Sequence, residues 1–243
     1  MQDNTFYISD ALELLRQLPD NSVDLIYTDP PYNVSNAASV FRDYRVTDRV
    51  ATISYDFGEW DYTYDPIPFL EEAKRVLNPH GNLIVWTSEH LFADYYAWMK
   101  ANMRYRNLLF YVRTNPLPNF RKRGYRQCTE LMAWATIGNL SNDNPNWIFL
   151  GQEETKTVKY APICGGKERR KLPSGKSHPT QKPLKICREI IRAHCRPEGI
   201  VVDPYCGVGT IPLAAHLEGR RFIGGDMNPE YIDMANLRVA EGY

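Results

Sequence analysis

A strand–turn–helix–strand pattern near the carboxyl end of the 243-residue chain restricts its fold more than any other feature. The apolar residues 200–203 lead into the turn 207–209 (Gly-Val-Gly), and residues 211–217 follow with helical spacing. A second apolar segment, 221–226, ends in an aspartate. Glycines let the backbone approach a ligand closely, and the amino terminus of the helix presents free N–H groups to it. The pattern predicts a nucleotide-binding βαβ unit, in which an acid at this place commonly holds ribose hydroxyls.

A tetrapeptide, Asp29-Pro30-Pro31-Tyr32, follows another apolar segment, 23–28. That segment is typical of a buried strand, and open α/β sheets bind ligands at the carboxyl ends of their strands. The prolines lack N–H groups, so nearby carbonyl groups are available to a substrate. With the flat face of the tyrosine, these acceptors suit the exocyclic amino group of a flipped nucleobase. The simplest alternative is a strand followed by a Pro-Pro turn.

Several motifs, taken in order, resemble the S-adenosylmethionine-dependent DNA amino-methyltransferases. The tetrapeptide resembles their catalytic motif, and residues 203–210 resemble their cofactor loop. Residues 178–183 (His-Pro-Thr-Gln-Lys-Pro), 115–120 and 130–134 match further family blocks. The catalytic block precedes the cofactor loop, which is the circularly permuted β-group arrangement. The resemblance covers nearly the whole chain and implies an α/β fold with a doubly wound, mostly parallel, Rossmann-like methyltransferase sheet.

The resemblance also implies roles for individual residues. Asp29 and the Pro30 carbonyl would accept hydrogen bonds from the target amino group, and Tyr32 would stack on the flipped base. The adenine of S-adenosyl-L-methionine would contact Asp10, and its ribose would contact Asp226. The other residues expected to bind the cofactor are Thr180, Lys182, Asp203, Gly207, Gly209 and Thr210. Residues expected to contact the DNA are Pro31, Asn33, Arg121, Lys122, Arg123 and Arg126. The alternatives are a helix cap for Asp10 and a surface charge for Lys182.

Adenine N6 is the expected target, because the family associates Asp at the first motif position with adenine and Ser with cytosine N4. Both bases present the same amino-group chemistry, so cytosine N4 is the alternative. Methylation of RNA or of a protein amide is also open, as is a non-catalytic relative that binds DNA or cofactor. The catalytic acid, the glycine turn and the final aspartate are all intact, which favours an active enzyme.

The net charge of zero conceals a basic segment. Residues 121–188 contain 14 Lys and Arg against 5 Asp and Glu, and the rest of the chain carries the matching acidic excess. A phosphate backbone would attract such a segment, in which aromatic residues are interspersed. We therefore expect an inserted target-recognition region at about 114–176, within a single methyltransferase domain spanning 1–243. The alternative is an ordinary solvated surface.

Composition predicts a cytoplasmic protein, and the resemblance together with the basic segment implies double-stranded DNA as its substrate. No apolar run approaches membrane-spanning length, and the N-terminus lacks a basic-then-apolar signal segment. The five cysteines lack metal-ligand spacing, so no metal site is expected and each is taken as a small buried filler. The resemblance leaves open a homodimer and a companion restriction endonuclease.

Apolar spacing predicts the remaining elements of the sheet and its helices. Strands are expected at 5–8, 83–86, 108–112 and 130–135. Helices are expected after Asp10 as N-cap and at 67–77, 91–103, 184–195 and 229–239. The helix 67–77 should close with the turn Asn78–Gly81. Two turn-rich regions, 33–64 and 137–175, predict irregular structure. The first is a flap over the target base, a DNA-contacting arm or a surface loop.

Overall fold

The structure is a computed structural model of the 243-residue chain. It describes residues 1–33, 64–119, 122, 124–141, 143–166, 168–172, 174–175, 178 and 180–242, and only the backbone of 42–45 and 50–53.

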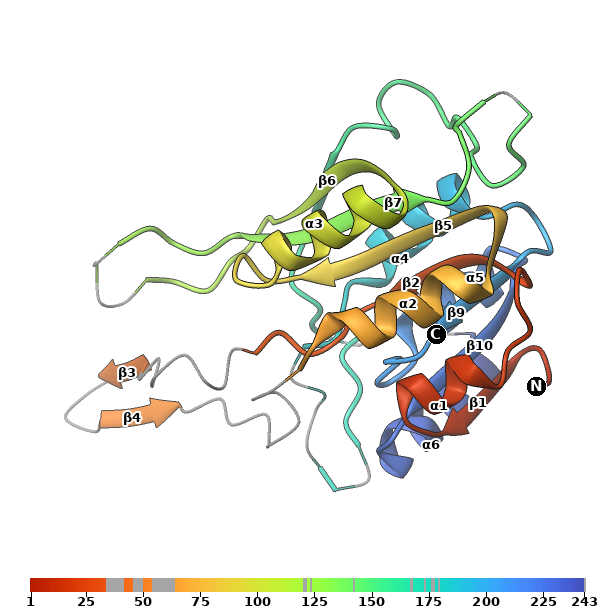
Figure 1. The fold of residues 1–243 in the computed structure, drawn as a ribbon. Coiled ribbons are helices and arrows are strands. Elements are labelled where there is room, and N and C mark those ends of the chain that lie inside the picture. Colours follow the sequence, from red (N-terminus) through yellow and green to blue (C-terminus); the bar gives the residue numbers. More distant parts are fainter. Residues whose placement is uncertain are drawn as a thin grey trace.

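One mixed sheet of eight strands runs through the described part of the chain (Figure 1). Its strands are β1 (Thr5–Ile8), β2 (Val23–Thr28), β5 (Leu77–Thr87), β6 (Arg104–Arg113), β7 (Thr129–Thr136), β8 (Val158–Ala161), β9 (Ile200–Asp203) and β10 (Arg221–Asp226). Their order is β1-β10-β9-β2-β5-β7-β6-β8, and within this sheet β7 runs against its two neighbours while the other pairs are parallel. Strands β3 (Arg42–Arg45) and β4 (Val50–Ile53) form a separate antiparallel pair.

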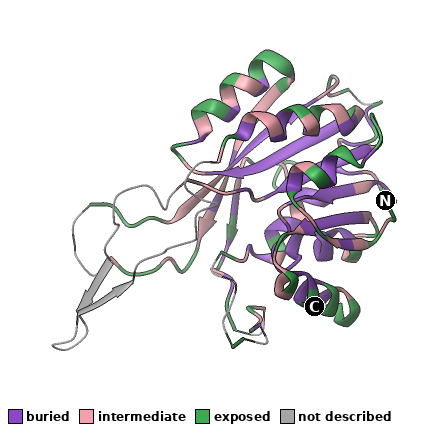
Figure 2. Ribbon diagram, turned by 60° about the horizontal axis from the view of Figure 1, so that its bottom comes forward, coloured by how far each residue is buried: buried purple, intermediate pink, exposed green. Residues whose placement is uncertain are grey.

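Helices cover both faces of the sheet. They are α1 (Ala11–Arg16), α2 (Pro66–Val76), α3 (Phe92–Asn102), α4 (Leu184–His194), α5 (Thr210–Leu217) and α6 (Pro229–Glu241). Leu14, Phe69 and Tyr95 of α1–α3 belong to one core layer, and Ile190 and Ala214 of α4 and α5 belong to the other. The strands are the most buried layer, and the helices turn their exposed sides outward (Figure 2). Among the described residues, no helix is long and apolar enough to cross a membrane.

The predicted doubly wound arrangement is confirmed. From β9 the chain continues through α5 to β10 on one side, and from β2 it continues through α2 to β5 on the other. The direction of winding therefore changes between β9 and β2, and the carboxyl ends of these two strands lie side by side. Open α/β sheets bind their ligands at such a switch point. Because β2 precedes β9 in the chain, the motif order is that of the permuted arrangement.

Three local expectations were wrong. Residues Asn78–Gly81 belong to the long strand β5 rather than to a turn, because the backbone becomes extended at Leu77, which already pairs with Val23 of β2. The region 137–175 contains β8, and 33–64 contains the β3–β4 pair. Of the five cysteines, Cys128 is only half-buried, because it lies on the connection before β7, whereas the other four are buried.

The buried carboxylate of Asp24 ties together the edge of the sheet at which the parallel strands begin. Its Oδ1 accepts hydrogen bonds from Asn78 Nδ2 (3.0 Å), Asn146 Nδ2 (3.1 Å) and Arg196 Nε (3.0 Å), and its Oδ2 accepts one from Ile200 N (2.8 Å). Burial alone would raise the pKa of Asp24, but these hydrogen bonds and the charge of Arg196 hold it below its usual value. The network joins β2, β5 and β9 at the edge opposite the predicted site.

Candidate active site

A hydrogen bond joins the ends of the two strands that meet at the switch point. Thr28 Oγ1, at the end of β2, donates to Asp203 Oδ1, at the end of β9, at 2.6 Å. Asp203 is 2% exposed, and burial raises its pKa to about 8, although Thr28 and the Tyr205 N–H both donate to it. Strands β2 and β9 are therefore joined by a side-chain hydrogen bond next to the predicted site.

Asp29 lies one residue beyond β2, in a cluster of charged side chains. Tyr32 OH donates to Asp29 Oδ1 at 2.5 Å, and Lys182 Nζ lies 3.0 Å from Asp29 Oδ2. The same ammonium lies 2.8 Å from Glu130 Oε2, and Arg113 Nη2 donates to Glu130 Oε1 at 2.5 Å. The structure thus brings the tetrapeptide, the His-Pro-Thr-Gln-Lys-Pro segment and the facing ends of β6 and β7 into one cluster.

The electrostatics of the cluster follow from burial and pairing. Burial raises the pKa of Asp29, while the charge of Lys182 and the Tyr32 hydrogen bond act in the opposite direction. Burial would also raise the pKa of Glu130, but Lys182 and Arg113 outweigh it and lower this pKa to about 2. Burial would lower the pKa of Lys182, but its two carboxylate partners raise it above the usual value. Two carboxylates and two cations therefore balance each other in a buried place.

Other residues of the tetrapeptide segment have structural contacts. Pro30 is buried, and Pro31 and Asn33 are half-buried. Asn33 Nδ2 donates to Tyr64 O at 2.8 Å, and Asn33 Oδ1 accepts from Tyr64 N at 2.9 Å. Asn33 thereby closes the two ends of the long 33–64 connection next to Asp29. The sequence placed Asn33 on the DNA, and the structure adds this clamping role.

The glycine turn between β9 and α5 has the geometry that its sequence predicts. Gly207 and Gly209 have φ values of 50° and 73°, in the left-handed region that favours glycine. Gly207 N donates to Asp226 Oδ2, at the end of β10, at 3.0 Å. A Cβ added to Gly207 would lie 2.8 Å from His178 Nε2. The turn, the acid and the segment that begins at His178 are therefore in contact.

Two exposed apolar side chains accompany the carboxylates at the ends of β1 and β10. Ile8 is 64% exposed and lies opposite Asp226 in the sheet register, while Met227 is 61% exposed and follows that acid in the chain. Asp10 caps α1 by accepting from backbone N–H groups of its first turn, which confirms the predicted N-cap. Sequence reasoning missed Ile8 and Met227, since an exposed apolar residue at a strand end resembles a buried one.

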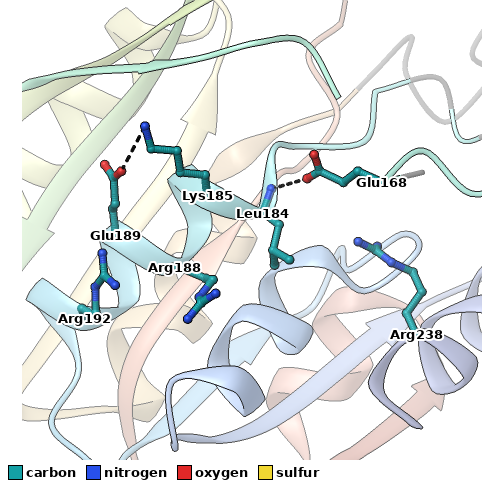
Figure 3. Close-up of a pocket in the computed structure, with 7 residues that line it drawn as sticks. All are labelled: Glu168, Leu184, Lys185, Arg188, Glu189, Arg192 and Arg238. Carbon is teal, nitrogen blue, oxygen red and sulfur yellow. Dashed lines mark hydrogen bonds and ion pairs between the residues drawn. The ribbon is translucent and has the colours of Figure 1, made fainter. Parts of the chain in front are cut away.

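A pocket of about 400 Å³, whose lining includes no residue of the Asp29 cluster, lies between α4 and α6 (Figure 3). Its lining is mostly charged and comprises Glu168, Leu184, Lys185, Arg188, Glu189, Arg192 and Arg238. Arg238 is 1% exposed, and its Nη1 donates to Val208 O at 2.6 Å and to Thr210 Oγ1 at 2.9 Å. The Thr210 side chain, predicted to face the cofactor, is thus engaged by Arg238, which braces the glycine turn.

The cations predicted to contact DNA lie in the connection between β6 and β7, which projects beyond the carboxyl edge of the sheet (Figure 1). Lys122 is exposed. Arg126 is also exposed, and its guanidinium donates to the carbonyl groups of residues 116 and 117. Arg121 and Arg123 lie outside the described residues. Of the predicted methionine-end residues, Thr180 is exposed and Lys182 lies in the Asp29 cluster.

Part of the basic segment serves the protein itself. Among the described residues, six of its cations pair with acids: Lys156 with Glu153, Lys159 and Lys185 with Glu189, Arg170 with Glu241, Lys182 with Asp29 and Glu130, and Arg188 with Glu218. Lys159 is also 8% exposed. The surplus of positive charge counted in the sequence therefore overstates what is available to a phosphate backbone.

Comparison with known proteins now identifies the family. The DNA methylase family model, which covers N6 and N4 enzymes, matches residues 23–237. The chain belongs to this family. The type II methyltransferase M.HinfI of Haemophilus influenzae is 30% identical over 248 residues, which cover 98% of this chain and 68% of that protein. In the crystal structure of the M1.HpyAVI–SAM complex, the aligned protein has a TM-score of 0.72 and 25% identity, with 97% and 98% of the two chains covered. The PvuII DNA methyltransferase, which is cytosine-N4-specific, gives a TM-score of 0.74 at 20% identity, with 98% and 86% covered.

This DNA methylase is a β-group amino-methyltransferase, as the motif order predicted, and its Rossmann-like sheet is confirmed. Sequence reasoning missed Glu130 and Arg113 as residues of the site. The only signal for them was the resemblance of residues 130–134 to a family block. Because β7 runs antiparallel, its first residues lie at the catalytic edge, and there Tyr111 of β6 pairs with Glu130.

Proposed function

We propose that this methylase transfers a methyl group from S-adenosyl-L-methionine to N6 of an adenine flipped out of double-stranded DNA. The observation that carries the proposal is the position of Asp29 at the switch point, directly after β2, which pairs with β9, and in contact with Lys182, which also pairs with Glu130. The structurally similar M1.HpyAVI forms a crystalline complex with SAM, and M.HinfI is a type II methyltransferase. Cytosine N4 is the alternative target, because the family covers both kinds of enzyme.

The described residues fit the proposed cofactor. Asp226 offers a carboxylate for ribose hydroxyls, and Asp10 lies at the end of the neighbouring strand. The exposed side chains of Ile8 and Met227 offer apolar surface to an adenine ring. The backbone of the 207–209 turn, with Asp203 beneath it, is proposed to lie beside the methionine part. When bound there, the cofactor supplies an electrophilic methyl group on a sulfonium.

The chain's own contribution is to prepare the amino group. An exocyclic amino nitrogen is a poor nucleophile, because its lone pair is delocalised into the ring. Asp29 and the Pro30 carbonyl would accept its two N–H bonds and shift it toward tetrahedral geometry, which exposes the lone pair. After methylation the nitrogen carries a surplus proton, which Asp29 would accept and pass to solvent. Most of the rate enhancement would then come from orientation and electrostatics.

Base binding requires a rearrangement of Tyr32. Its hydroxyl donates to Asp29 Oδ1 and accepts from Lys182 Nζ at 3.0 Å, so it occupies one oxygen that the amino group would use. The ring would swing away as the base arrives and then stack on it. Without DNA, the hydroxyl satisfies Asp29 Oδ1, while Lys182 pairs with Oδ2.

The DNA surface is proposed to include the connection between β6 and β7, where Lys122 and Arg126 are exposed. Arg121 and Arg123 belong to the same proposal. The target-recognition region proposed at 114–176 surrounds β7, an internal strand of the main sheet, so recognition should reside in the connections on either side of it. A homodimer, a companion endonuclease and a cytoplasmic location remain predictions.

The test is incubation of unmethylated genomic DNA with the protein and S-adenosyl-L-methionine, followed by nucleoside mass spectrometry and single-molecule sequencing. We expect N6-methyladenine in one sequence context, and no product from Asp29→Ala, which should still bind the cofactor. N4-methylcytosine would establish the alternative. Absence of both products on DNA of varied composition would refute the proposed function.

A further inference from the structure

All three N–H groups of the Lys182 ammonium have acceptors within the Asp29 cluster. The side chain is 6% exposed, and Nζ lies 3.0 Å from Asp29 Oδ2, 2.8 Å from Glu130 Oε2 and 3.0 Å from Tyr32 OH. An ammonium group has three hydrogens to donate. Lys182 is therefore already satisfied by the protein, and its nearest negative charges are two carboxylates.

Glu130 is held in turn by Arg113. Both Nη2 and Nε of Arg113 donate to Glu130 Oε1, at 2.5 and 3.2 Å, and the two side chains are 24% and 18% exposed. The chain of contacts thus runs from Arg113 on β6 through Glu130 on β7 and Lys182 before α4 to Asp29 after β2. Each side chain in this series carries the charge opposite to that of its neighbours, because a buried charge is stable only when it is paired.

Other titratable groups face this chain from every element packed around it. They are Tyr27 of β2, Tyr95 of α3, Tyr111 of β6, His178, Cys187 of α4 and Asp203 of β9. In all six, burial moves the pKa toward the neutral form, to about 4 for His178 and to about 8 for Asp203. At neutral pH the charges near Asp29 are therefore those of Arg113, Glu130 and Lys182.

We propose that Glu130 is a positioning residue: together with Arg113 it fixes the Lys182 ammonium against Asp29, so that Lys182 can keep Asp29 ionised and aimed at the target amino group. This inference rests on the proposed function. A protonated Asp29 would donate a hydrogen bond instead of accepting one from the amino group. The Lys182 ammonium favours the ionised form, and Glu130 with Arg113 fixes the ammonium against Asp29 Oδ2. Oδ1 is then left for the amino group once Tyr32 has moved.

Lys182 and Glu130 have opposite effects on the pKa of Asp29. Lys182 lowers the pKa of Asp29, whereas the negative charge of Glu130 raises it. Lys182→Met should therefore move the acid limb of the pH–rate profile upward by at least about one pH unit, and Glu130→Gln should move it downward by about half a unit or more. If these side chains only supported the fold, the two variants would lose activity, but the acid limbs of their pH–rate profiles would not shift in opposite directions.

The experiment measures single-turnover methyl transfer from pH 5 to 9 for the parent, Lys182→Met and Glu130→Gln. We expect a loss of at least about tenfold at pH 7 for Lys182→Met with partial recovery at pH 9, and a lower plateau with an earlier rise for Glu130→Gln. Glu218→Gln is the matched control, since Glu218 is a 10%-exposed carboxylate paired with Arg188 at 2.6 Å, outside this cluster. Its profile should coincide with that of the parent.

Acid limbs of both variants that coincide with the parent's would overturn the proposal. If Lys182→Met does not fold, the downward shift in Glu130→Gln decides alone. Cofactor affinity, measured by calorimetry, should stay within about threefold in Glu130→Gln, which separates positioning of Asp29 from loss of the cofactor. If the parent methylates no DNA, the proposed function fails, but the Asp29 carboxyl can still be titrated by carbon-detected NMR. Its pKa should then shift in the same opposite directions, and equal pKa values would refute the inference.

Discussion

Removal of the Asp24 carboxylate should destabilise the fold strongly while leaving the catalytic edge intact. Asp24 is 2% exposed and accepts hydrogen bonds from three side chains and the Ile200 N–H. In Asp24→Ala the buried Asn146 amide and the Ile200 N–H lose their acceptor, at a cost of about 1–3 kcal/mol each. Arg196 is 43% exposed and can be solvated by water, so its loss adds little. We expect the free energy of unfolding to fall by about 3–5 kcal/mol.

The same variant should show a defined pH dependence. Because the pKa of Asp24 in the folded protein lies below its ordinary value, its contribution is complete above the unfolded value of about 4 and is lost as the pH falls through the folded value. The difference in stability between parent and Asp24→Ala should therefore be larger at pH 7 than at pH 3.

The assay is urea unfolding followed by circular dichroism at both pH values. Asp3→Ala is the control: Asp3 pairs with Arg221 at 2.6 Å, but the two side chains are 35% and 43% exposed, so we expect a loss below about 1 kcal/mol. A loss below about 1 kcal/mol for Asp24→Ala, or one that is the same at both pH values, would refute the reasoning.

Three further outcomes are expected. Tyr32→Phe keeps the ring but removes the hydroxyl that is hydrogen-bonded to Asp29. The KM for DNA should therefore fall, while kcat changes by less than about threefold. A raised KM would contradict this prediction. Asp203→Asn should gain stability relative to the parent as the pH rises from 5 to 8, by up to about 1.4 kcal/mol per pH unit. The reason is that burial keeps the Asp203 carboxyl of the folded parent protonated, whereas the same carboxyl ionises in the unfolded chain. A difference in unfolding free energy that stays constant over this pH range, measured by urea unfolding, would disprove the prediction. Gly207→Ala should weaken cofactor binding by about tenfold or more, measured by calorimetry, since its φ is 50° and the new Cβ would meet an imidazole; Gly124→Ala, with φ of 74° and open space, should not, and equal affinities would count against this role.

The parallel part of the sheet was predictable because its strands are covered on both faces. All six residues of β2 are buried, so the strand appears in the sequence as a mainly apolar run, interrupted by Asp24 and ended by Thr28. Strand β8 has no such pattern, because it is an edge strand whose Tyr160 is 59% exposed. Residues 78–81 of β5 have the composition of a turn, and they fall in the register shift between the pairs Val23–Leu77 and Leu25–Asn82, which no local sequence pattern predicts.

The residues of the candidate site also differ in how far the sequence predicts their positions. Asp29 and the glycine turn follow strands that end at the switch point, so elementary rules of α/β sheets place them together. Glu130 lies at the start of its strand, and it reaches the edge of the sheet where Asp29 lies because β7 runs in the opposite direction. Its contact with Arg113 depends on the register between β6 and β7, and no local pattern encodes that register.

Under the proposed function, the hydrogen bond from Tyr32 to Asp29 sets a condition on which flipped bases the enzyme can accept. In the absence of DNA the carboxylate already has a donor, and a base can replace this donor only by presenting an N–H group of its own. At the ring position that would face Asp29, adenine and cytosine carry the amino groups N6 and N4, whereas guanine and thymine carry the oxygens O6 and O4, which a carboxylate repels. The Tyr32–Asp29 hydrogen bond would therefore discriminate between an amino group and an oxygen at this position before methyl transfer begins.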